Sequence, residues 1–402
     1  MRMSKKKEIV PKFRFPEFQR DGIDFVHGNK LFKSITNKNH NSDLPILAIT
    51  QDQGAVPRDQ IEYNVTVTDK SLSNYKVVEV GDFIISLRSF QGGIEYSRFK
   101  GICSPAYIIL RKREENISEL YYKYFFKTWR YIQSLNRNLE GIRDGKMISY
   151  SQFSSVKVPY PRSFKEQQKI ADCLSSIDEL IDAENRKLKA LEKYKKGLMQ
   201  KLFPAEGKNL PEWRFPEFRG KSEWRIKPLG KICTNYDSRR IPITEKDRVK
   251  GEIPYIGASG VIDYINDFIF DEDLLCVSED GANLVARTYP IAFSISGKTW
   301  VNNHAHVLKF SHKYTQDIVE SYLNMINLQD FLTGMAQPKL NRAKLDIIPI
   351  PLPEEEEQQK IADCLSEVDK IITEQSNKVE QLKAHKKGLM QGLFPSLEEA
   401  DV

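Results

Sequence analysis

Acidic and histidine side chains in the second half of the chain are the residues best suited, by type and spacing, to do chemistry. Glu279 and Asp280 follow one apolar stretch, and His304 and His306 surround the start of the next. We expect these stretches to pair as strands, which would bring carboxylates and imidazoles together, as acid–base or metal chemistry requires. The alternative, which we favour, is a turn at Asp280-Gly281 and a strand on which His306 alternates with apolar residues.

Other catalytic signatures are absent from the sequence. Glu354 to Glu357 could belong to a nuclease-type acidic cluster, but we place this run at a helix start, where carboxylates interact favourably with the helix dipole. Gly141 to Lys146 lacks the GxxxxGK(S/T) spacing of a nucleotide-binding loop. The sequence also lacks a glycine-rich turn for adenosylmethionine, an Asn-Pro-Pro-aromatic motif and a Cys/His cluster with zinc-ligand spacing. We therefore expect no catalytic residues, no metal and no cofactor on this chain.

Charge and cysteine usage narrow the class of protein. The formal net charge of +6 is uneven, since residues 1–165 carry +11 (28 basic against 17 acidic side chains) and residues 205–356 carry −3 (19 against 22). A basic first half favours contact with a polyanion. Five cysteines without CxxC spacing indicate reduced thiols in a cytoplasmic protein. No stretch approaches the ~18 apolar residues of a membrane span, so we expect no membrane contact.

A long internal repeat provides the elements that must position the rest of the chain. Glu166 to Pro204 and Glu357 to Pro395 align without a gap, and 23 of 39 positions are identical. Each copy predicts one long helix, and about 37 helical residues would span ~55 Å. The identical positions include surface residues, which folding alone does not require. We therefore expect the two copies to pair with each other as a spacer and to offer the same face to the same kind of partner.

Apolar residues recur in both copies at alternating steps of four and three, the a/d pattern of a coiled coil. Polar residues interrupt this seam at matching places, Glu184 with Gln375 and Lys195 with Lys386, which lowers stability and helps to fix the register. The predicted seam consists of Ile170, Leu174, Ile177, Ile181, Leu188, Leu191, Leu198 and Leu202 in the first copy, and of Ile361, Leu365, Val368, Ile372, Val379, Leu382, Leu389 and Leu393 in the second.

Two variable blocks of similar size separate the helices. Each begins with nearly the same phrase, at Pro11 to Phe18 and at Pro211 to Phe218, which we interpret as an extended segment held by its aromatic rings. The chain is thus a cycle of block, helix, block and helix, cut once. The expected domains are a first block (residues 1–165), a helix (166–204), a second block (205–356), a helix (357–395) and a tail (396–402).

Both blocks show the same order of predicted elements. The first has strands at 82–87 and 106–110 with a loop at 89–94 between them, an aromatic helix at 119–132, a loop at 141–146 and a closing strand at 158–161. The second has strands at 274–277 and 305–308, a helix at 316–332, a loop at 334–340 and a closing stretch at 347–353. This order indicates one α+β fold that is used twice with different surfaces.

These features resemble the specificity (S) subunit of type I restriction–modification systems. The resemblance is carried by the repeated helix (EQQKIADCL…KKGLMQ.LFP) and by three phrases of the second block, Trp224 to Ile232, Thr333 to Leu340 and Ile348 to Gln358. It covers nearly the whole chain. The first block fits more loosely, with Phe25 in place of a tryptophan and Gly141 to Tyr150 in place of the Gly-x-x-x-Gln-Pro-Lys phrase.

The resemblance implies two target recognition domains, each of which reads one half of a split double-stranded DNA target. It also implies that the two long helices pair antiparallel and set the gap between the halves. It also implies two modification (methyltransferase) subunits and up to two restriction (motor nuclease) subunits as partners. S-adenosylmethionine, ATP and Mg²⁺ would then belong to those partners, and this chain would be non-catalytic. The rival hypotheses are a coiled-coil scaffold that binds only proteins, and a nuclease or methyltransferase with unfamiliar motifs.

Candidate DNA contacts are basic, amide and aromatic side chains in predicted loops, because such groups bind base edges and phosphates. Arg239 and Arg240 are the best isolated candidates for phosphate contacts in the second block. The candidates are Arg88, Gln91, Tyr96, Arg98, Arg143, Lys146 and Tyr150 in the first block, and Arg239, Arg240, Asn283, Arg287, Lys298, Asn302, Asn303, Gln337 and Lys339 in the second.

Overall fold

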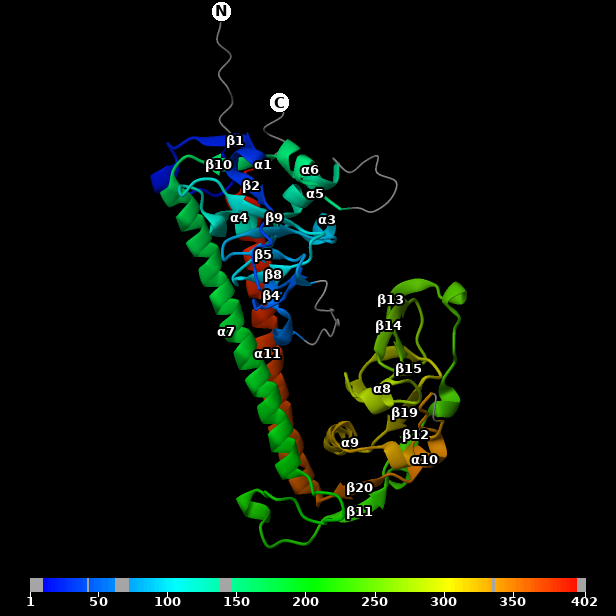
Figure 1. The fold of residues 1–402 in the computed structure, drawn as a ribbon. Coiled ribbons are helices and arrows are strands. Elements are labelled where there is room, and N and C mark those ends of the chain that lie inside the picture. The colour runs from blue at the N-terminus through cyan, green and yellow to red at the C-terminus, as the bar shows by residue number, and fades with distance from the viewer. Residues whose placement is uncertain (1–9, 42, 62–71, 138–146, 335–336, 396–402) are drawn as a thin grey trace, which may run out of the picture. The chain divides into compact units, whose positions relative to one another are not determined.

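The computed structural model describes residues 10–41, 43–61, 72–137, 147–334 and 337–395 of the chain. The chain divides into two compact units, the first with residues 1–184 and 378–402 and the second with residues 185–377. Each unit contains one variable block and half of each long helix (Figure 1). The predicted α+β class, with two similar halves and two long helices, is confirmed. Among the described residues, no helix is long and apolar enough to cross a bilayer.

The repeat copies form α7 (Phe164–Leu202) and α11 (Glu355–Leu393), each 39 residues long. Both helices begin two residues before the predicted start. They also end two residues before the proline that closes each copy, since a residue that precedes proline disfavours helical geometry. Every predicted seam residue is buried or half-buried, in keeping with the a/d pattern.

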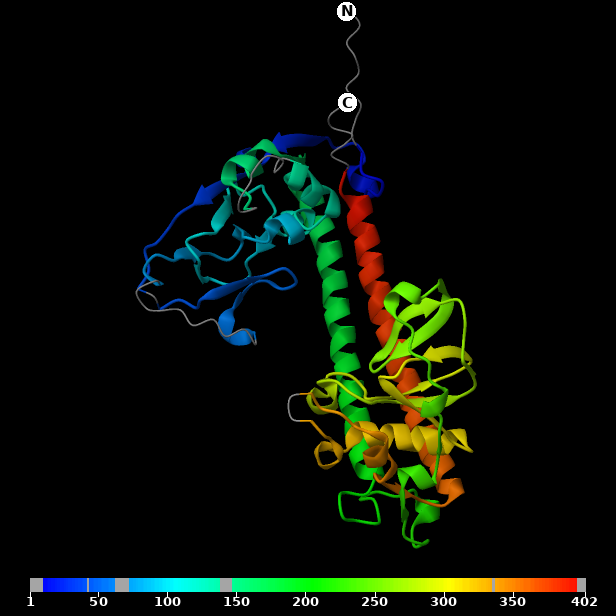
Figure 2. The ribbon, with the colours of Figure 1, turned by 90° about the vertical axis from the view of Figure 1, so that its right-hand side faces the viewer.

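Within the first unit, α7 and α11 run antiparallel. Asp178, in the first half of α7, accepts a hydrogen bond from Lys386, near the end of α11. Lys378 donates to Glu184 at 2.6 Å, so a predicted polar interruption of the seam is an inter-helix ion pair. Both views show the two helices side by side here (Figures 1 and 2).

The second unit repeats this pairing. Lys195, near the end of α7, lies 2.5 Å from the carboxylate of Asp369, in the first half of α11. Lys195 and Asp369 stand at the same repeat positions as Lys386 and Asp178. The two ion pairs are thus copies of one another, and both fix the antiparallel register in the way that polar seam residues do.

The strands of the first unit form one four-stranded sheet, ordered β2-β9-β6-β7, and three two-stranded sheets, β1-β10, β3-β4 and β5-β8. All of these pairings are antiparallel. The strands are β1 (Ile23–His27), β2 (Phe32–Ile35), β3 (Leu47–Thr50), β4 (Gly54–Pro57), β5 (Lys76–Val78), β6 (Phe83–Ile85), β7 (Glu95–Tyr96), β8 (Gly101–Cys103), β9 (Ile108–Lys112) and β10 (Lys157–Pro161).

The strands of the second unit form two four-stranded sheets, ordered β12-β19-β16-β17 and β14-β13-β18-β15, and the pair β11-β20. Only β13 and β18 pair in parallel among the strands described. The strands are β11 (Arg225–Pro228), β12 (Thr234–Asn235), β13 (Lys250–Gly257), β14 (Gly260–Ile265), β15 (Phe270–Asp271), β16 (Leu274–Ser278), β17 (Ala292–Ile295), β18 (Lys298–Val301), β19 (Ala305–Lys309) and β20 (Pro349–Leu352).

The two units share their strand plan. The β1-β10 pair of the first corresponds to β11-β20 of the second, and the sheet β2-β9-β6-β7 corresponds to β12-β19-β16-β17 in the same order. The strand β10 or β20 leads directly into the long helix in each case. The prediction of one fold used twice is therefore confirmed at the level of topology.

The short helices of the first unit depart from two predictions. The predicted helix at 119–132 is two helices, because the N–H of Thr128 bonds to the carbonyl of Phe125 three residues back, and its hydroxyl caps the same carbonyl at 2.7 Å. The predicted loop at 89–94 contains a helical turn. The helices are α1 (Gly28–Leu31), α3 (Ser89–Gly92), α4 (Glu119–Phe125), α5 (Trp129–Arg137) and α6 (Tyr150–Ser155), with the 3-10 turns η1 (Pro16–Phe18) and η2 (Arg58–Gln60).

In the second unit the predicted helix at 316–332 begins earlier and ends earlier, as α9. The last part of the predicted helix is a 3-10 turn instead, and the side chain of Leu328, which precedes this turn, is buried. The helices are α8 (Asn283–Ala286), α9 (Lys313–Met325) and α10 (Arg342–Asp346). The 3-10 turns are η3 (Pro216–Phe218), η4 (Leu229–Lys231), η5 (Asp237–Arg239), η6 (Glu245–Asp247) and η7 (Gln329–Phe331).

Each unit has a main core that includes the ends of both long helices. In the first unit, aromatic side chains of α4 pack around Phe394, which follows α11, with Tyr121 and Phe125 at ring distances of 5.1 and 5.6 Å. In the second unit, Phe203, which follows α7, packs against Tyr322 of α9 at 5.7 Å. The seam residues at the helix ends therefore belong to the globular cores.

The repeated phrase at the start of each block joins that block to a helix. Arg14 forms a two-pronged ion pair with Glu166, which is fully buried, and Arg214 forms the same pair with Glu357. The phrase ends in a 3-10 turn whose last phenylalanine is buried, so the predicted extended segment is wrong for its last three residues.

The phrase also contacts the end of a long helix in both units. Phe13 N–H donates to the Gly392 carbonyl of α11 at 2.8 Å, and Trp213 N–H donates to the Lys201 carbonyl of α7 at 2.9 Å. The first block therefore contacts the end of α11, which is far from it in sequence. The second block contacts the end of α7, which directly precedes it in the chain. This is the cyclic arrangement that the sequence predicted.

Candidate nucleic-acid interface

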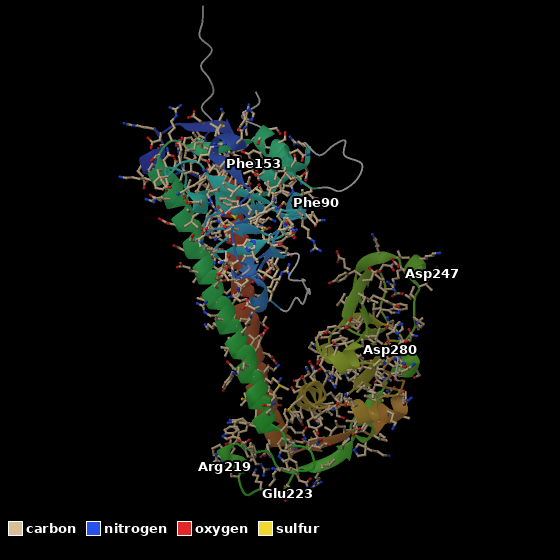
Figure 3. The ribbon with its side chains drawn as sticks, viewed as in Figure 1. Phe90, Phe153, Arg219, Glu223, Asp247 and Asp280 are labelled. Carbon is tan, nitrogen blue, oxygen red and sulfur yellow. The ribbon has the colours of Figure 1, made fainter. Side chains whose placement is uncertain are left out.

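Three segments with predicted DNA-contacting residues meet at one edge of the second unit. β16 pairs antiparallel with β19, and Ser278 lies opposite Ala305, so the residues that follow β16 and precede β19 are neighbours. The strand pairing predicted from the sequence is confirmed. The third segment ends at Leu340, whose N–H donates to the Glu279 carbonyl at 2.8 Å. Figure 3 labels Asp280 in this region.

His306 lies beneath this edge, and both of its ring nitrogens face hydrogen-bond acceptors. Nδ1 lies 2.6 Å from Oδ2 of Asp237, and Nε2 lies 2.7 Å from the Leu340 carbonyl oxygen. A carboxylate and a carbonyl oxygen both accept hydrogen bonds, so the ring of His306 is held between two acceptors. Burial would raise the pKa of the Asp237 carboxyl, but the hydrogen bond and charge of His306 hold it below its ordinary value.

Arg240 supports the same edge from within. Its guanidinium lies 2.8 Å from Oε2 of Glu279 and 2.8 Å from the Ala305 carbonyl, and only 13% of its side chain is exposed. Glu279 also pairs with Lys339 at 3.2 Å. Burial would raise the pKa of Glu279, but the Arg240 hydrogen bond and the His306 charge outweigh it and lower that pKa. These contacts give Arg240 a structural role, in which its guanidinium positions the edge.

The acidic and histidine residues at this edge do not form a catalytic constellation. His304 Nδ1 pairs with Asp280 at 2.8 Å on the surface, and Gly281 has a φ of 112°, as the favoured turn requires. His306 stands on strand β19. Throughout the described part of the chain, no group of three or more His, Cys, Asp or Glu residues is arranged to hold a metal.

Three further candidates in the second unit make internal contacts. The Asn283 side chain is buried and binds backbone groups of residues 288 and 289. The guanidinium of Arg287 donates to the carbonyls of Leu323 and Ile326 at 3.1 and 3.0 Å. Asn302 is 6% exposed and accepts a hydrogen bond from the backbone of residue 304. These three side chains therefore stabilise the conformation of the backbone around them.

Five candidates of the second unit have exposed side chains. Arg239 lies over the rings of Tyr236 and Phe270 at 4.5 and 4.7 Å, and pairs with Glu272 at 3.0 Å. The others reach solvent from β18, from the turn before β19 and from the segment that His306 fixes. The exposed candidates are Arg239, Lys298, Asn303, Gln337 and Lys339.

In the first unit, Arg88 and Gln91 are exposed at the helical turn α3, which follows β6. Figure 3 shows Phe90 of this turn on the side of the first unit's sheets away from α7. The place of α3 after β6 matches the place of the edge residues after β16. The two units therefore present different side chains at the same point of one topology.

Lys127 holds α3 in place. Its ammonium donates to the carbonyls of Gln51 and Gly92 at 3.1 and 2.9 Å and to Glu95 Oε1 at 2.5 Å. The Gln51 side chain in turn donates to the Arg88 carbonyl at 3.3 Å. Glu95 is 2% exposed, and this burial raises its pKa to about 7 even though Lys127 opposes the shift.

The remaining candidates of the first unit lie in three settings. Arg98 is exposed after β7, while the Tyr96 ring packs edge-on to a core phenylalanine at 5.5 Å. The Tyr150 hydroxyl donates to the Phe32 carbonyl at 3.0 Å, so this side chain has a structural role. Arg143 and Lys146 lie outside the described residues.

The sequence analysis missed the residues that position these edges. Asp237, Glu95 and Lys127 carry no local motif, because each meets its partner across a distance in sequence. The Arg14–Glu166 ion pair could have been found from the sequence, because the arginine belongs to the repeated phrase and the glutamate to the repeated helix, so both recur.

The chain resembles known proteins over nearly its whole length. A family model described as the type I restriction modification DNA specificity domain matches residues 21–193 and 221–383. The type I restriction enzyme MjaVIII specificity subunit of Methanocaldococcus jannaschii is 25% identical over 355 residues, which cover 81% of this chain and 80% of that protein.

Two further similarities concern one part of the sequence and the whole fold. The putative type I restriction enzyme specificity subunit S.HindORF215P of Haemophilus influenzae is 33% identical over 153 residues, so the match spans 38% of this chain and 39% of that protein. The crystal structure of the S subunit of a type I restriction–modification system from M. genitalium superposes with a TM-score of 0.59 at 15% identity. It covers 97% of this chain and 100% of the other.

Proposed function

Since this chain belongs to the type I restriction–modification DNA specificity family, we propose that each of its units reads one half of a split DNA target. The chain is a DNA specificity subunit with two target recognition domains, the non-catalytic component of such a system. The proposal concerns how this chain divides the work. The first block, residues 1–165, would read one half-site, and the second block, residues 205–356, would read the other.

The observation that carries this proposal is the use of one topology twice with different residues at the same edge. In the first unit the edge presents Arg88 and Gln91, and in the second it presents Asn303, Gln337 and Lys339. Guanidinium and amide groups form paired hydrogen bonds with base edges, whereas ammonium groups favour phosphates. Different side chains on one scaffold are what two different half-sites require.

We propose that α7 and α11 fix the gap between the half-sites. A 39-residue helix is ~58 Å long, which exceeds the ~34 Å of one turn of B-DNA. The duplicated lysine–aspartate pairs support a single antiparallel register, because a slipped register would separate both pairs. The bases between the half-sites would then remain unread.

The proposed partners are double-stranded DNA, two modification subunits and up to two restriction subunits in the cytoplasm. The matching surface residues of the two repeat copies support two equivalent places for a modification subunit. S-adenosylmethionine, ATP and Mg²⁺ would be held by those subunits, and the chemistry of methyl transfer and cleavage would be theirs. This chain would supply sequence recognition and geometry.

Exchange of one block tests the proposal. Residues 205–356 would be replaced by the second block of a family member with a known target, and methylated sites would be mapped by sequencing in cells that express the modification subunit. We expect one half of the target to change while the other half and the gap stay the same. A chimera that alters both halves, or neither, would contradict the division of reading between the blocks.

A further inference from the structure

The second unit contains an open hollow, of about 660 Å³, between α9 and the two long helices. Its lining includes Lys195 of α7, Ser366 and Asp369 of α11, and Ser321 of α9. Methionine and other apolar side chains also line it. The first unit shows which kind of side chain can occupy the corresponding place.

The corresponding place in the first unit is filled by Tyr124 of α4. Its ring is 2% exposed, and its hydroxyl donates to Asp178 at 2.7 Å and lies 3.1 Å from the hydroxyl oxygen of Ser175. The ammonium of Lys386 lies 5.2 Å from the ring centroid. A phenol is thus held by an aspartate, a serine and a lysine of the paired helices.

Those three residues recur in the hollow. Ser366 and Asp369 stand at the repeat positions of Ser175 and Asp178, and Lys195 stands at that of Lys386. The correspondence is exact in sequence, since each pair is 191 residues apart. The second unit therefore keeps the polar groups that bind a tyrosine hydroxyl in the first.

Only the tyrosine is missing, because Ser321 stands where Tyr124 stands in the first unit. Two contacts fix this alignment of α4 with α9. Phe125 packs on Phe394 as Tyr322 packs on Phe203. A glutamine of each long helix also accepts a hydrogen bond from the start of the short helix, at Ser118 and at Thr315.

Exposure reflects the missing ring. The Asp369 side chain is 51% exposed, whereas its counterpart Asp178 is 24% exposed beneath Tyr124. Met199 and Met325 line the hollow, and such flexible, polarizable side chains adapt to aromatic rings. A ring that entered would meet an acceptor for its hydroxyl and apolar contacts for its faces.

We propose that this hollow binds a tyrosine side chain of the modification subunit, with the phenol hydroxyl donated to Asp369. The identity of the partner rests on the proposed function. The argument for a tyrosine rests on Tyr124, which occupies the equivalent place within this chain. In the first unit Tyr124 fills the corresponding place, so this contact would be added at one of two otherwise equivalent places for a modification subunit.

The test replaces Ser321 with tyrosine, so that the chain fills its own hollow. We expect Ser321→Tyr to leave the melting temperature unchanged or raised, and to weaken binding of the modification subunit by about tenfold or more, as loss of a buried aromatic anchor does. Binding would be measured by titration of the full chain and by native mass spectrometry. Ser311→Tyr adds the same bulk on the exposed turn before α9 and should leave affinity unchanged.

A photo-crosslinking residue at Met199 identifies the occupant. The crosslinked peptide of the modification subunit should contain a tyrosine, and its Tyr→Phe variant should weaken binding by the same factor as Asp369→Ala. The two changes together should add nothing further, since they remove one hydrogen bond. Asp178→Ala in the first unit is the matched control, because it also removes a lysine–aspartate pair between the helices, and it should weaken binding less than Asp369→Ala.

Equal affinity of Ser321→Tyr and the unmodified chain would overturn the inference while leaving the proposed function intact. A crosslink to a second copy of this chain would overturn it as well. If the unmodified chain formed no complex with the modification subunit, the proposed function and this inference would both fail.

Discussion

At the scale of single residues, His306 joins two parts of the second unit's edge. Its two nitrogens bridge the Asp237 carboxylate and the Leu340 carbonyl oxygen. The segment with Gln337 and Lys339 is therefore oriented by a buried side chain. His304, two residues earlier, makes a single surface ion pair and offers a natural comparison.

We predict that His306→Gln destabilises the second unit by about 2–4 kcal/mol, because a glutamine cannot reproduce both contacts of the buried ring and leaves a buried acceptor unpaired. Chemical denaturation would measure the loss. His304→Gln should cost less than about 1 kcal/mol, as for an exposed ion pair. In methylation assays His306→Gln should reduce discrimination at one half-site only. Equal behaviour of the two variants would refute the positioning role of His306.

A second residue-scale prediction concerns Glu95, whose burial raises its pKa to about 7 from an ordinary value of 4.5. Between these values the folded state binds more protons than the unfolded state, so the contribution of Glu95 to stability falls as pH rises through this window. Glu95→Gln should therefore gain stability relative to the unmodified chain between about pH 4.5 and pH 7, by on the order of 3 kcal/mol at most.

Denaturation midpoints measured across that pH range would test this expectation. Glu114→Gln, at an exposed position of the same unit, is the control and should show no such trend. A constant difference between Glu95→Gln and the unmodified chain at every pH would rule out titration of Glu95 as the cause.

At the scale of elements, each joint between a block and a long helix contains one buried ion pair. Glu166 and Glu357 are buried, and each accepts two hydrogen bonds from one arginine. Removal of one partner from a buried pair leaves an uncompensated charge, which costs more than the pair itself contributes.

Arg14→Met should therefore destabilise the first unit by about 3–5 kcal/mol. The double variant with Glu166→Leu should recover most of that loss, because no buried charge remains. Arg214→Met and Glu357→Leu form the matched set in the second unit. Differential scanning calorimetry would follow both units, and a double variant no more stable than Arg14→Met would argue against this account.

The sequence predicted elements well where the signal was local or repeated. The a/d seam fixed both helices to within two residues, and the recurrence of Lys195 and Lys386 pointed to a paired register. The break between α4 and α5 was missed because Thr128 is neither glycine nor proline, and its hydroxyl ends the helix by capping a carbonyl. The edges were harder still, since Asp237 and His306 are 69 residues apart in sequence.

At the scale of the whole molecule, the length of the paired helices is the quantity that the proposed function depends on. Asp182 of α7 and Thr373 of α11 stand at equivalent repeat positions near the middle of each helix. Insertion of one heptad after each keeps the seam in phase, because seven residues complete one a-to-g cycle.

Such a double insertion lengthens each helix by ~10 Å, the rise of about three base pairs. We predict methylation of targets whose half-sites are unchanged and whose gap is about three base pairs longer. Genome-wide methylation mapping would read this directly. Insertion in one helix alone breaks the pairing and should abolish modification. An altered half-site sequence in the double insertion would contradict the assignment of spacing to the helices.

The chemical likeness of the two joints has a consequence for how such a protein diversifies. Each block enters through an arginine in the same phrase and leaves before a glutamate in the same helical repeat, so neither position demands a particular block. A gene segment that encodes one block can then be replaced wholesale without disturbing the other joint. New specificities would arise by recombination between intact modules, in a single event, rather than by the slow accumulation of point substitutions.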